Sequence, residues 1–525
     1  MICVTIGRTR HKQIMAEHLN LAQRGAELVE LRVDWISRPP RIGELLRNRP
    51  TPTVLTIRLP ADGGRFSGTE ETRQTLLREA IVAGVEYVDL EEELASKIRR
   101  YGKTKRIISY HNMEETPDDL EEIHERLSKL DADVVKVVTM ANSPVDNVRL
   151  LKLARNAKVP TVAFCMGEYG IVSRILCGKF GSPFTYCTFS KERVMAPGQL
   201  PFDEMKKLYR FDQINESTAV FGVLGDPVSH SWSPLLHNAA FKRMKLNAVY
   251  LPIRVTPEDF TPTLKAFEEL GIRGYSVTIP HKEAAVKFAD KPDETSQKIG
   301  AANTLFKDSK GLWRAANTDL PAALESIELG LQAKGESGLS GKRVLILGAG
   351  GAARAIAWGV MQAGGVLMVS NRSKERGMKL AEELGCQFVT WANRGAQAVD
   401  VIVNCTPIGM FPEMAQSPYE QYWLRDGMVV FDTIYNPENT MLIREAREHR
   451  CQTVSGIEMF IRQAAAQFKF FTGRETSLDE MRSTLRRAIS PVRVKTETGH
   501  APPSEATSSQ EETPPATETG SGEST

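Results

Sequence analysis

Charged side chains recur at or near the ends of short apolar runs in the first half of the chain. They are Arg32, Asp34, Arg58, Glu91, His111 and Lys136. A charge inside an apolar strand costs several kcal/mol unless it is paired or used. In a parallel sheet that closes into a barrel, the carboxyl ends of the strands build the active site. Six such groups together therefore predict a catalytic centre rather than six solvated charges.

Hydroxyl, amide, lysine and aspartate side chains gather in four short motifs of the second half. The motifs occupy residues 229–234, 275–282, 302–304 and 317–319. Such groups at strand ends suit a polyhydroxylated substrate that carries a carboxylate. Taken alone, Ser231 and Ser233 could instead cap the helix that follows them, so both interpretations stay open at this point.

A glycine-rich turn separates an apolar strand from an apolar helix at residues 342–353. Gly348 permits the tight turn, Gly350 lets the backbone approach a pyrophosphate, and the helix N-terminus offers amide donors. An NAD site usually carries an acidic residue at the end of the next strand. This chain has Arg372 and Arg376 there, and guanidinium groups bind a 2′-phosphate well. The motif predicts dinucleotide binding, with NADP(H) favoured over NAD.

Eight apolar runs alternate with amphipathic segments in the first two hundred residues. The runs cover residues 2–7, 28–34, 53–59, 87–91, 106–111, 134–140, 161–166 and 184–189. Alternating strands and helices imply a parallel sheet, and eight such units predict a (β/α)₈ barrel.

The remaining chain predicts a second α/β region and a tail. Residues 210–218 read as a linker, and strand and helix patterns resume at residue 219. From about residue 495 onward the chain contains no Leu, Ile, Val or Phe. Such a segment cannot bury enough apolar surface to offset the entropy of ordering, so we predict a disordered, inert acidic tail.

Composition excludes some classes of protein. The chain has 525 residues with 67 Lys+Arg, 65 Asp+Glu and a net charge of +2. This balance gives no reason to expect nucleic acid or an anionic membrane as a partner. The seven cysteines are dispersed, which favours reduced thiols and a cytoplasmic location. The N-terminus has no signal-peptide pattern, and no metal-ligand cluster is evident.

These motifs resemble two known families. Residues 1–212 are similar to the type I 3-dehydroquinate dehydratases, and residues 219–490 to the shikimate dehydrogenases. The first resemblance rests on Glu30-Leu31-Arg32-Val33-Asp34, Asp89-Leu90-Glu91, Ser109-Tyr110-His111, Lys136, Val172-Ser173-Arg174 and Ala196-Pro197-Gly198-Gln199. The second rests on 230–234, 277–282, Asn303-Thr304, Asn317-Thr318-Asp319, the glycine-rich turn and Gly456…Met459…Gln463-Ala464-Ala465. The order is that of the plant-type bifunctional fusion.

The resemblance implies the domain organisation. An N-terminal (β/α)₈ barrel would occupy residues 1–212, followed by a two-lobed α/β dehydrogenase over 219–490. Within the latter, 219–320 would bind substrate, 321–455 would form a Rossmann lobe for NADP, and helices over 456–490 would return to the substrate lobe. The disordered tail would cover 495–525.

The resemblance also implies the activities and the residues that carry them. The first half would dehydrate 3-dehydroquinate to 3-dehydroshikimate through a Schiff base on Lys136, with His111 as general base oriented by Glu91. The second half would reduce 3-dehydroshikimate to shikimate with NADPH, Lys282 and Asp319 relaying the proton. The product would feed aromatic amino acid (chorismate) biosynthesis.

Further residues are implied to bind the substrates and the cofactor. The expected substrate-binding residues are Glu30, Arg32, Arg58, Arg174, Gln199, Ser231, Ser233, Thr278, Asn303, Tyr435 and Gln463. The expected cofactor-binding residues are Gly348, Ala349, Gly350, Gly351, Ala352, Asn371, Arg372, Ser373, Arg376, Thr406 and Gly456.

The chain departs from the family patterns at four positions. Met195 stands where serine is frequent, Asn112 where aspartate is usual, Ser276 where asparagine is commoner, and Ala322 where glycine is usual. Two alternatives are a quinate dehydrogenase in the second half and a non-catalytic regulator on the same folds. The hydroxyls of Ser231, Ser233 and Thr278 favour shikimate. Retention of all five catalytic groups argues against a regulator.

Overall fold

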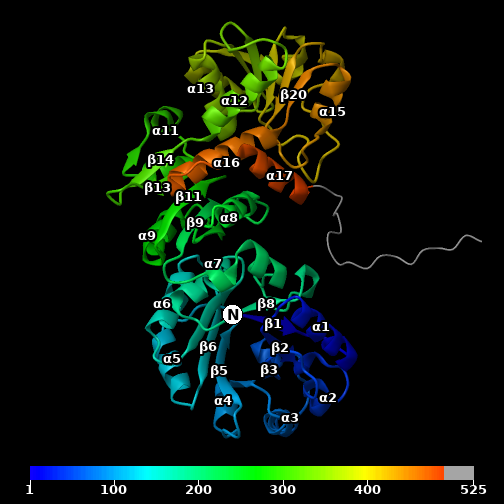
Figure 1. The fold of residues 1–525 in the computed structure, drawn as a ribbon. Coiled ribbons are helices and arrows are strands. Elements are labelled where there is room, and N and C mark those ends of the chain that lie inside the picture. The colour runs from blue at the N-terminus through cyan, green and yellow to red at the C-terminus, as the bar shows by residue number, and fades with distance from the viewer. Residues whose placement is uncertain (490–525) are drawn as a thin grey trace, which may run out of the picture. The chain divides into compact units, whose positions relative to one another are not determined.

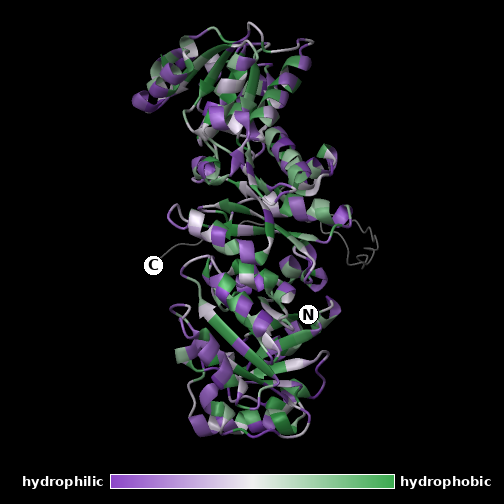
Figure 2. Cartoon of the chain, turned by 90° about the vertical axis from the view of Figure 1, so that its left-hand side faces the viewer, coloured by the Kyte–Doolittle hydropathy of each residue, from purple (hydrophilic) through white to green (hydrophobic). Residues whose placement is uncertain are grey.

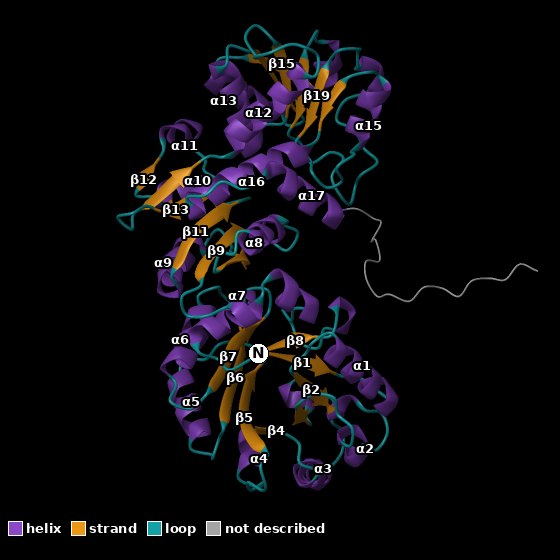
Figure 3. Ribbon diagram, in the orientation of Figure 1, coloured by secondary structure: helices purple, strands orange, loops and turns teal. Residues whose placement is uncertain are grey.

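Three β-sheets organise the chain (Figures 1 and 3). The computed structural model describes residues 1–489. The tail predicted over 495–525 lies outside the described residues. Each sheet is described below by itself.

The first sheet is an eight-stranded, parallel, nearly closed barrel. Its strands are β1 (Ile2–Ile6), β2 (Leu28–Arg32), β3 (Thr53–Thr56), β4 (Tyr87–Glu91), β5 (Lys105–Asn112), β6 (Val134–Met140), β7 (Thr161–Met166) and β8 (Thr185–Thr188). The hydrogen-bonded order is β7-β6-β5-β4-β3-β2-β1-β8, so this ladder leaves β7 and β8 as its two ends. Side chains meet across them, because the rings of Phe164 and Tyr186 lie 6.1 Å apart. The predicted barrel is confirmed.

Helices connect the barrel strands. They are α1 (His11–Gln23), α2 (Ile42–Leu46), α3 (Glu70–Val82), α4 (Glu92–Ala95), α5 (Leu120–Ser128), α6 (Asp146–Asn156) and α7 (Ile171–Leu176). The start of α3 shows why they form where they do. The Thr69 side chain accepts a hydrogen bond from the Thr72 amide, and Glu70 and Glu71 complement the helix dipole.

Strand alternation sorts the barrel interior into layers. Figure 2 shows mainly hydrophobic strands, with hydrophilic residues concentrated on helices and loops. An apolar interior cluster includes Cys3, Leu28, Val54, Ile107, Val134, Val162 and Phe184. Two residues further along, the same strands carry Thr5, Glu30, Thr56, Ser109, Lys136, Phe164 and Tyr186. Residues two apart on a strand point to the same side, so both sets point into the barrel. The first set forms an apolar layer, and the second forms a layer that carries the polar groups.

The second sheet is mixed. Its strands are β9 (Ala219–Gly225), β10 (Ala248–Arg254), β11 (Ile272–Val277), β12 (Lys291–Pro292), β13 (Thr304–Lys307) and β14 (Trp313–Ala316), in the order β10-β9-β11-β13-β14-β12. Strand β13 runs antiparallel to β11 and β14. The helices of this region are α8 (Ser233–Arg243), α9 (Phe260–Ala266), α10 (Lys282–Phe288), α11 (Glu294–Ile299), α16 (Gly456–Thr472) and α17 (Leu478–Ile489). Phe221 and Leu236 share an apolar core with Ile461 and Phe468 of α16.

The third sheet is entirely parallel and doubly wound. Its strands are β15 (Arg343–Leu347), β16 (Val366–Asn371), β17 (Gln387–Thr390), β18 (Val401–Asn404), β19 (Val429–Asp432) and β20 (Gln452–Val454). The order β17-β16-β15-β18-β19-β20 is that of a dinucleotide-binding fold, which confirms the predicted Rossmann lobe. Its helices are α12 (Asp319–Gln332), α13 (Gly351–Gln362), α14 (Lys374–Leu384) and α15 (Met441–Glu448). Every helix within residues 1–489 is too short or too polar to cross a bilayer.

Candidate active sites

A cavity in the barrel brings together most of the residues predicted for the first site. Its lining includes Lys136, His111, Glu30, Arg32, Arg58, Arg174 and Gln199. Glu91 is not part of that lining. Its carboxylate instead pairs with Arg58 at 3.5 Å and with Arg73 of α3 at 3.1 Å. Glu91 therefore reaches His111 through Arg58 rather than by direct contact.

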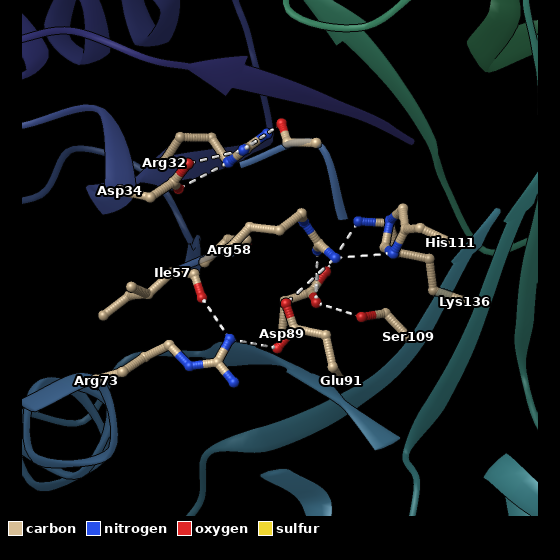
Figure 4. A network of polar contacts seen from close by, with 12 residues as sticks. Arg32, Asp34, Ile57, Arg58, Arg73, Asp89, Glu91, Ser109, His111 and Lys136 are labelled. Atoms are coloured by element: carbon tan, nitrogen blue, oxygen red, sulfur yellow. Dashed lines mark hydrogen bonds and ion pairs between the residues drawn. The ribbon is translucent and has the colours of Figure 1, made fainter. Parts of the chain in front are cut away.

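Lys136 is held by groups from three other strands, one of which carries Asp89 (Figure 4). Its Nζ donates to Asp89 Oδ2 at 2.8 Å, lies 3.8 Å from Glu30 Oε1 and sits 4.2 Å from the centre of the Tyr186 ring. Threonine hydroxyls of β1 and β3 donate to Glu30, at 2.8 Å each. The amine is thus fixed in a preorganised position inside the cavity.

His111 contacts a cation instead of a carboxylate. Its Nδ1 lies 2.8 Å from Arg58 Nη1. A guanidinium only donates hydrogen bonds, so Nδ1 is the acceptor and a neutral ring carries its proton on Nε2. Burial, and then the charges of Arg58 and Lys136, hold the pKa of His111 well below its ordinary value. The imidazole is therefore neutral at neutral pH, as a general base must be.

Arg174 lies in α7 and is an almost fully buried cation with little compensation. It is 2% exposed, donates from Nη2 to the Pro197 carbonyl at 3.1 Å and lies 4.5 Å from the centre of the Phe164 ring. Its Nε has no hydrogen-bond partner among residues 1–489. Burial lowers the pKa of this guanidinium to about 10, so it stays charged at neutral pH. A buried, unpaired cation in a cavity wall is suited to an anionic ligand group.

Two loops complete the barrel cavity. Gln199 accepts hydrogen bonds through Oε1 from the amides of Met195, at 3.0 Å, and Ala196, at 3.3 Å, and so holds its loop against the cavity. Arg32 forms a two-pronged ion pair with Asp34, at 2.9 and 2.8 Å. The departure at Met195 is thus compatible with the loop geometry, because the backbone makes the contact.

The second site centres on a lysine–aspartate pair. Lys282 Nζ lies 2.6 Å from Asp319 Oδ2. Lys282 is the first residue of α10 and Asp319 the first residue of α12. The Asn317 side chain accepts from the amides of Asp319 and Leu320, at 3.1 Å each, which fixes the start of α12.

Asn303 anchors the segment before Asp319. It donates from Nδ2 to Thr318 Oγ1 at 2.9 Å and accepts the Thr318 amide at 2.8 Å. Behind it, Gln467 Nε2 donates to the Asn303 carbonyl at 3.0 Å. Ser276, at one of the departures from the family pattern, donates to Gln467 Oε1 at 2.6 Å and accepts from the Tyr250 hydroxyl at 2.5 Å. The serine is therefore fully used in a buried network.

The other predicted substrate residues of this half form smaller groups of their own. The Ser233 amide donates to Ser231 Oγ at 3.3 Å, so a cap and a ligand-binding hydroxyl are compatible at this turn. The Tyr435 ring stacks on Phe460 at 4.4 Å, and Gln463 donates to the Phe460 carbonyl at 3.0 Å. Thr278, partly exposed, lies just before Lys282.

Two glycines in the third sheet are dictated by geometry. Gly348 has φ +121°, and a side chain there would lie 3.0 Å from the Cys405 carbonyl oxygen. At Gly456 an added Cβ would come within 2.4 Å of the carbonyl oxygens of Thr433 and Ile434. Both positions therefore exclude any side chain. Helix α13 begins at Gly351, so its free amides face the turn that Gly348 permits.

The end of β16 offers open basic groups. Asn371 Nδ2 donates to the Ser373 carbonyl at 2.8 Å and orders the turn. Asn371, Arg372 and Thr406 line a cavity of ≈ 320 Å³. Arg372 and Arg376 are exposed, and no ion pair within residues 1–489 engages either one. The glycine turn, the helix N-terminus and these free guanidinium groups fit a dinucleotide with a 2′-phosphate.

The described residues 1–489 contain no group of three or more His, Cys, Asp or Glu placed to hold a metal ion. All seven cysteines are free thiols.

Known families match most of the chain. Residues 2–216 match the family described as type I 3-dehydroquinase. Residues 223–305 match the shikimate dehydrogenase substrate binding domain, and residues 456–486 the shikimate 5′-dehydrogenase C-terminal domain. Residues 343–431 match a family described as NADP oxidoreductase, coenzyme F420-dependent.

A bifunctional relative spans both halves. The chloroplastic bifunctional 3-dehydroquinate dehydratase/shikimate dehydrogenase of Arabidopsis thaliana is 37% identical over 496 residues, which cover 90% of this chain and 82% of the relative. The chain belongs to this bifunctional family. The shikimate dehydrogenase (NADP(+)) of Moorella thermoacetica is 39% identical and covers 53% of this chain and 96% of its own length. A solved shikimate dehydrogenase in complex with NADP+ is 37% identical, covers 53% of this chain and 98% of that one, with a TM-score of 0.50.

The bifunctional enzyme is thus a 3-dehydroquinate dehydratase and an NADP-dependent shikimate dehydrogenase of the shikimate pathway. This confirms the predicted family, activities and cofactor. The individual residue roles remain predictions.

Sequence analysis gave no role to several polar side chains that the structure brings to these sites, and three of them are central to the networks. They are Asp89 in the barrel and Tyr250 and Gln467 in the dehydrogenase half. Asp89 was a detectable case, because it has the same parity on β4 as Glu91 and so points to the same side of the strand. Tyr250 and Gln467 lie 217 residues apart in the chain, and no local pattern joins them.

Proposed function

We propose that Lys136 and His111 carry out the dehydration. The observation that carries this proposal is that both line one cavity with the unpaired Arg174 cation. The Lys136 amine attacks the substrate ketone, a C–N bond forms, and the carbonyl oxygen leaves as water. The cationic imine then accepts the electron pair released when His111 removes the C2 proton. Loss of the hydroxyl as a second water, assisted by the same His111, and hydrolysis of the imine restore the lysine.

Arg58 controls when His111 can act. Nδ1 of His111 is occupied by Arg58 in this structure. A substrate hydroxyl that accepts a hydrogen bond from Arg58 would release Nδ1 for proton removal. Arg174 would hold the substrate carboxylate by charge-assisted hydrogen bonds.

For the reduction, we propose that Lys282 and Asp319 deliver the proton to the carbonyl oxygen. NADPH, when bound, supplies the hydride that reaches the carbonyl carbon. Lys282 donates a proton to the carbonyl oxygen as an ammonium, and Asp319 at 2.6 Å holds the lysine in place and relays to it a proton taken up from solvent. Asn303 and the Ser231 and Ser233 hydroxyls would orient the substrate.

The cofactor preference is testable at the end of β16. We expect the double variant Arg372→Ala/Arg376→Ala to raise the KM for NADPH by at least one to two powers of ten and to leave NADH use nearly unchanged. Each lost charge-assisted hydrogen bond to a phosphate costs about 1.5–3 kcal/mol. Steady-state kinetics with both cofactors measures the difference. Lys379→Ala is the control, because Lys379 is exposed and lies on α14 together with Arg376. Equal losses with both cofactors would show that these arginines do not bind the 2′-phosphate.

The pH profile of the dehydratase tests His111. Activity is lost as the base becomes protonated, so the acidic limb of kcat/KM should lie well below pH 6.5, because the pKa of His111 is lowered. Arg58→Gln removes a charge that opposes the imidazolium, so the limb should move to higher pH. Arg100→Gln, which removes an exposed arginine paired with Asp131, should leave the limb in place. An unmoved limb in Arg58→Gln would mean that a different group is the base.

We also propose a cytoplasmic location, supported by the seven free thiols. The term chloroplastic belongs to the Arabidopsis thaliana relative. Imaging of the tagged full-length chain in its source cells would decide between the cytoplasm and an organelle.

A further inference from the structure

Asp89 is a buried carboxylate at the centre of the dehydratase site. Its side chain is 0% exposed. Oδ1 accepts hydrogen bonds from Arg58 Nη2 at 2.8 Å and from Ser109 Oγ at 2.6 Å, and Oδ2 accepts from Lys136 Nζ at 2.8 Å. Three donors, from β5, from β6 and from the segment directly after β3, therefore converge on one group of β4 (Figure 4).

These contacts join the nucleophile to the base. Lys136 is held by Asp89, Asp89 holds Arg58, and Arg58 Nη1 lies 2.8 Å from His111 Nδ1. The four residues lie on or directly after β6, β4, β3 and β5, which are consecutive neighbours in the sheet. The separation between Lys136 and His111 is thus set by a continuous polar chain and by strand pairing.

The neighbouring positive charges keep the Asp89 carboxylate ionised. Burial alone would raise the pKa of the Asp89 carboxyl, but the positive charges of Arg58 and Lys136 outweigh it and hold the pKa well below its usual range. Asp89 therefore stays ionised and acts as an anchor, not as a proton carrier. Asp89 is also the closer of the two acidic partners of Lys136, since Glu30 lies 3.8 Å away.

Imine formation increases the dependence on this anchor. An ammonium has three N–H donors, whereas the nitrogen of a protonated imine keeps one, because two of the three hydrogens leave in the water molecule that is released. A single N–H can be held by one acceptor, and Asp89 Oδ2 at 2.8 Å is already in place. The same carboxylate then balances the positive charge of the imine while the C2 proton is removed.

We propose that Asp89 is a positioning residue of the dehydratase, which holds the Lys136 nitrogen from the free enzyme through the imine and, through Arg58, keeps His111 at a fixed distance from it. This inference rests on the proposed roles of Lys136 and His111.

Asp89→Asn tests the proposal in the full-length enzyme. The variant keeps the size of the side chain but removes the charge, and its single NH2 group would face either Arg58 or Lys136, which only donate. We expect the dehydratase kcat to fall about 10²-fold, the scale of misplacing a reacting group by about 1 Å. Dehydrogenase activity of the same sample should be unchanged, and the thermal unfolding transition of the barrel reports whether the variant is folded there.

The pH profile separates positioning from a general loss of structure. His111 is faced by the cations Arg58, Lys136 and Arg32 and by the anion Asp89. Removing the anion lowers the pKa of His111 further, so the acidic limb of Asp89→Asn should move to lower pH, opposite to the shift in Arg58→Gln. Ser109→Ala removes the neutral donor to Asp89 Oδ1. This variant should keep kcat within about threefold and leave the acidic limb in place.

The outcomes are distinct. A turnover of Asp89→Asn within threefold of the parent, with an unmoved limb, would overturn the proposal. Where Asp89→Asn does not fold, Asp89→Glu keeps the charge and shifts it by one methylene. A reduced dehydratase kcat in Asp89→Glu, with the acidic limb unmoved, then supports the proposal that Asp89 sets the position of its partners. A parental kcat contradicts it. Borohydride trapping in the parent enzyme is the separate check. No adduct on Lys136 would sink the Schiff-base proposal itself, whereas a normal adduct with unaffected Asp89 variants sinks only the role of Asp89.

Discussion

Lys136→Ala should abolish the dehydratase and leave the shikimate dehydrogenase at its parental rate. Without the amine no imine can form, so we expect the dehydratase kcat to fall by at least about 10⁴-fold. Addition of borohydride together with 3-dehydroquinate should add mass to the peptide that contains Lys136 in the parent enzyme. The same treatment should modify nothing in the variant.

The dehydrogenase activity should not change in this variant, because its proposed catalytic residues lie outside the barrel. Lys282 and Asp319 begin helices α10 and α12, whereas Lys136 lies on β6 of the barrel. This separation accords with our proposal that the barrel ends near residue 212 and the dehydrogenase begins near residue 219. The variant should therefore still interconvert 3-dehydroshikimate and shikimate.

Two control variants separate the nucleophile from its charge. Lys136→Arg keeps a cation beside Asp89 but cannot form an imine, so it should be as inactive as Lys136→Ala while being more stable. Lys105→Ala removes an exposed lysine of β5 and should retain full activity and the adduct. An adduct on another lysine, or substantial turnover in Lys136→Ala, would contradict the assignment.

The barrel strands were predictable because each is a short apolar run bounded by turn residues. The predicted limits 87–91, 134–140 and 161–166 coincide with β4, β6 and β7. The run predicted over 53–59 is longer than β3, which ends at Thr56. Arg58 follows that end and turns toward Asp89 and His111, contacts that no local pattern contains.

The candidate sites show the same division between local and distant information. The pair Lys282 and Asp319 was implied by the family resemblance of two motifs, and the structure places each residue at the start of a helix. The partners of Glu91 could not, because Arg73 reaches it from the neighbouring helix α3. Nor could the sequence indicate that β7 and β8 meet through aromatic side chains. The alternation of side chains along a strand does not say which strands are neighbours.

Lys282→Met and Asp319→Asn should each disable the shikimate dehydrogenase without affecting the dehydratase. A positioned proton donor contributes about 10²–10⁴-fold to rate, so we expect kcat to fall by that factor in each variant. The KM for NADPH should change little, because the glycine turn and the arginines at β16 are untouched. With 3-dehydroquinate and NADPH supplied, both variants should accumulate 3-dehydroshikimate, which can be followed by its ultraviolet absorbance.

The double variant decides whether the two residues act as one unit. The 2.6 Å contact between Lys282 Nζ and Asp319 Oδ2 implies that each loses its function when the other is removed, so the double variant should be no slower than the worse single variant. Multiplicative losses would show that the lysine and the aspartate act independently. Lys287→Met, at an exposed position of the same helix α10, is the matched control and should retain the parental rate. If Lys282→Met retained that rate as well, another residue would have to be the proton donor to the carbonyl oxygen.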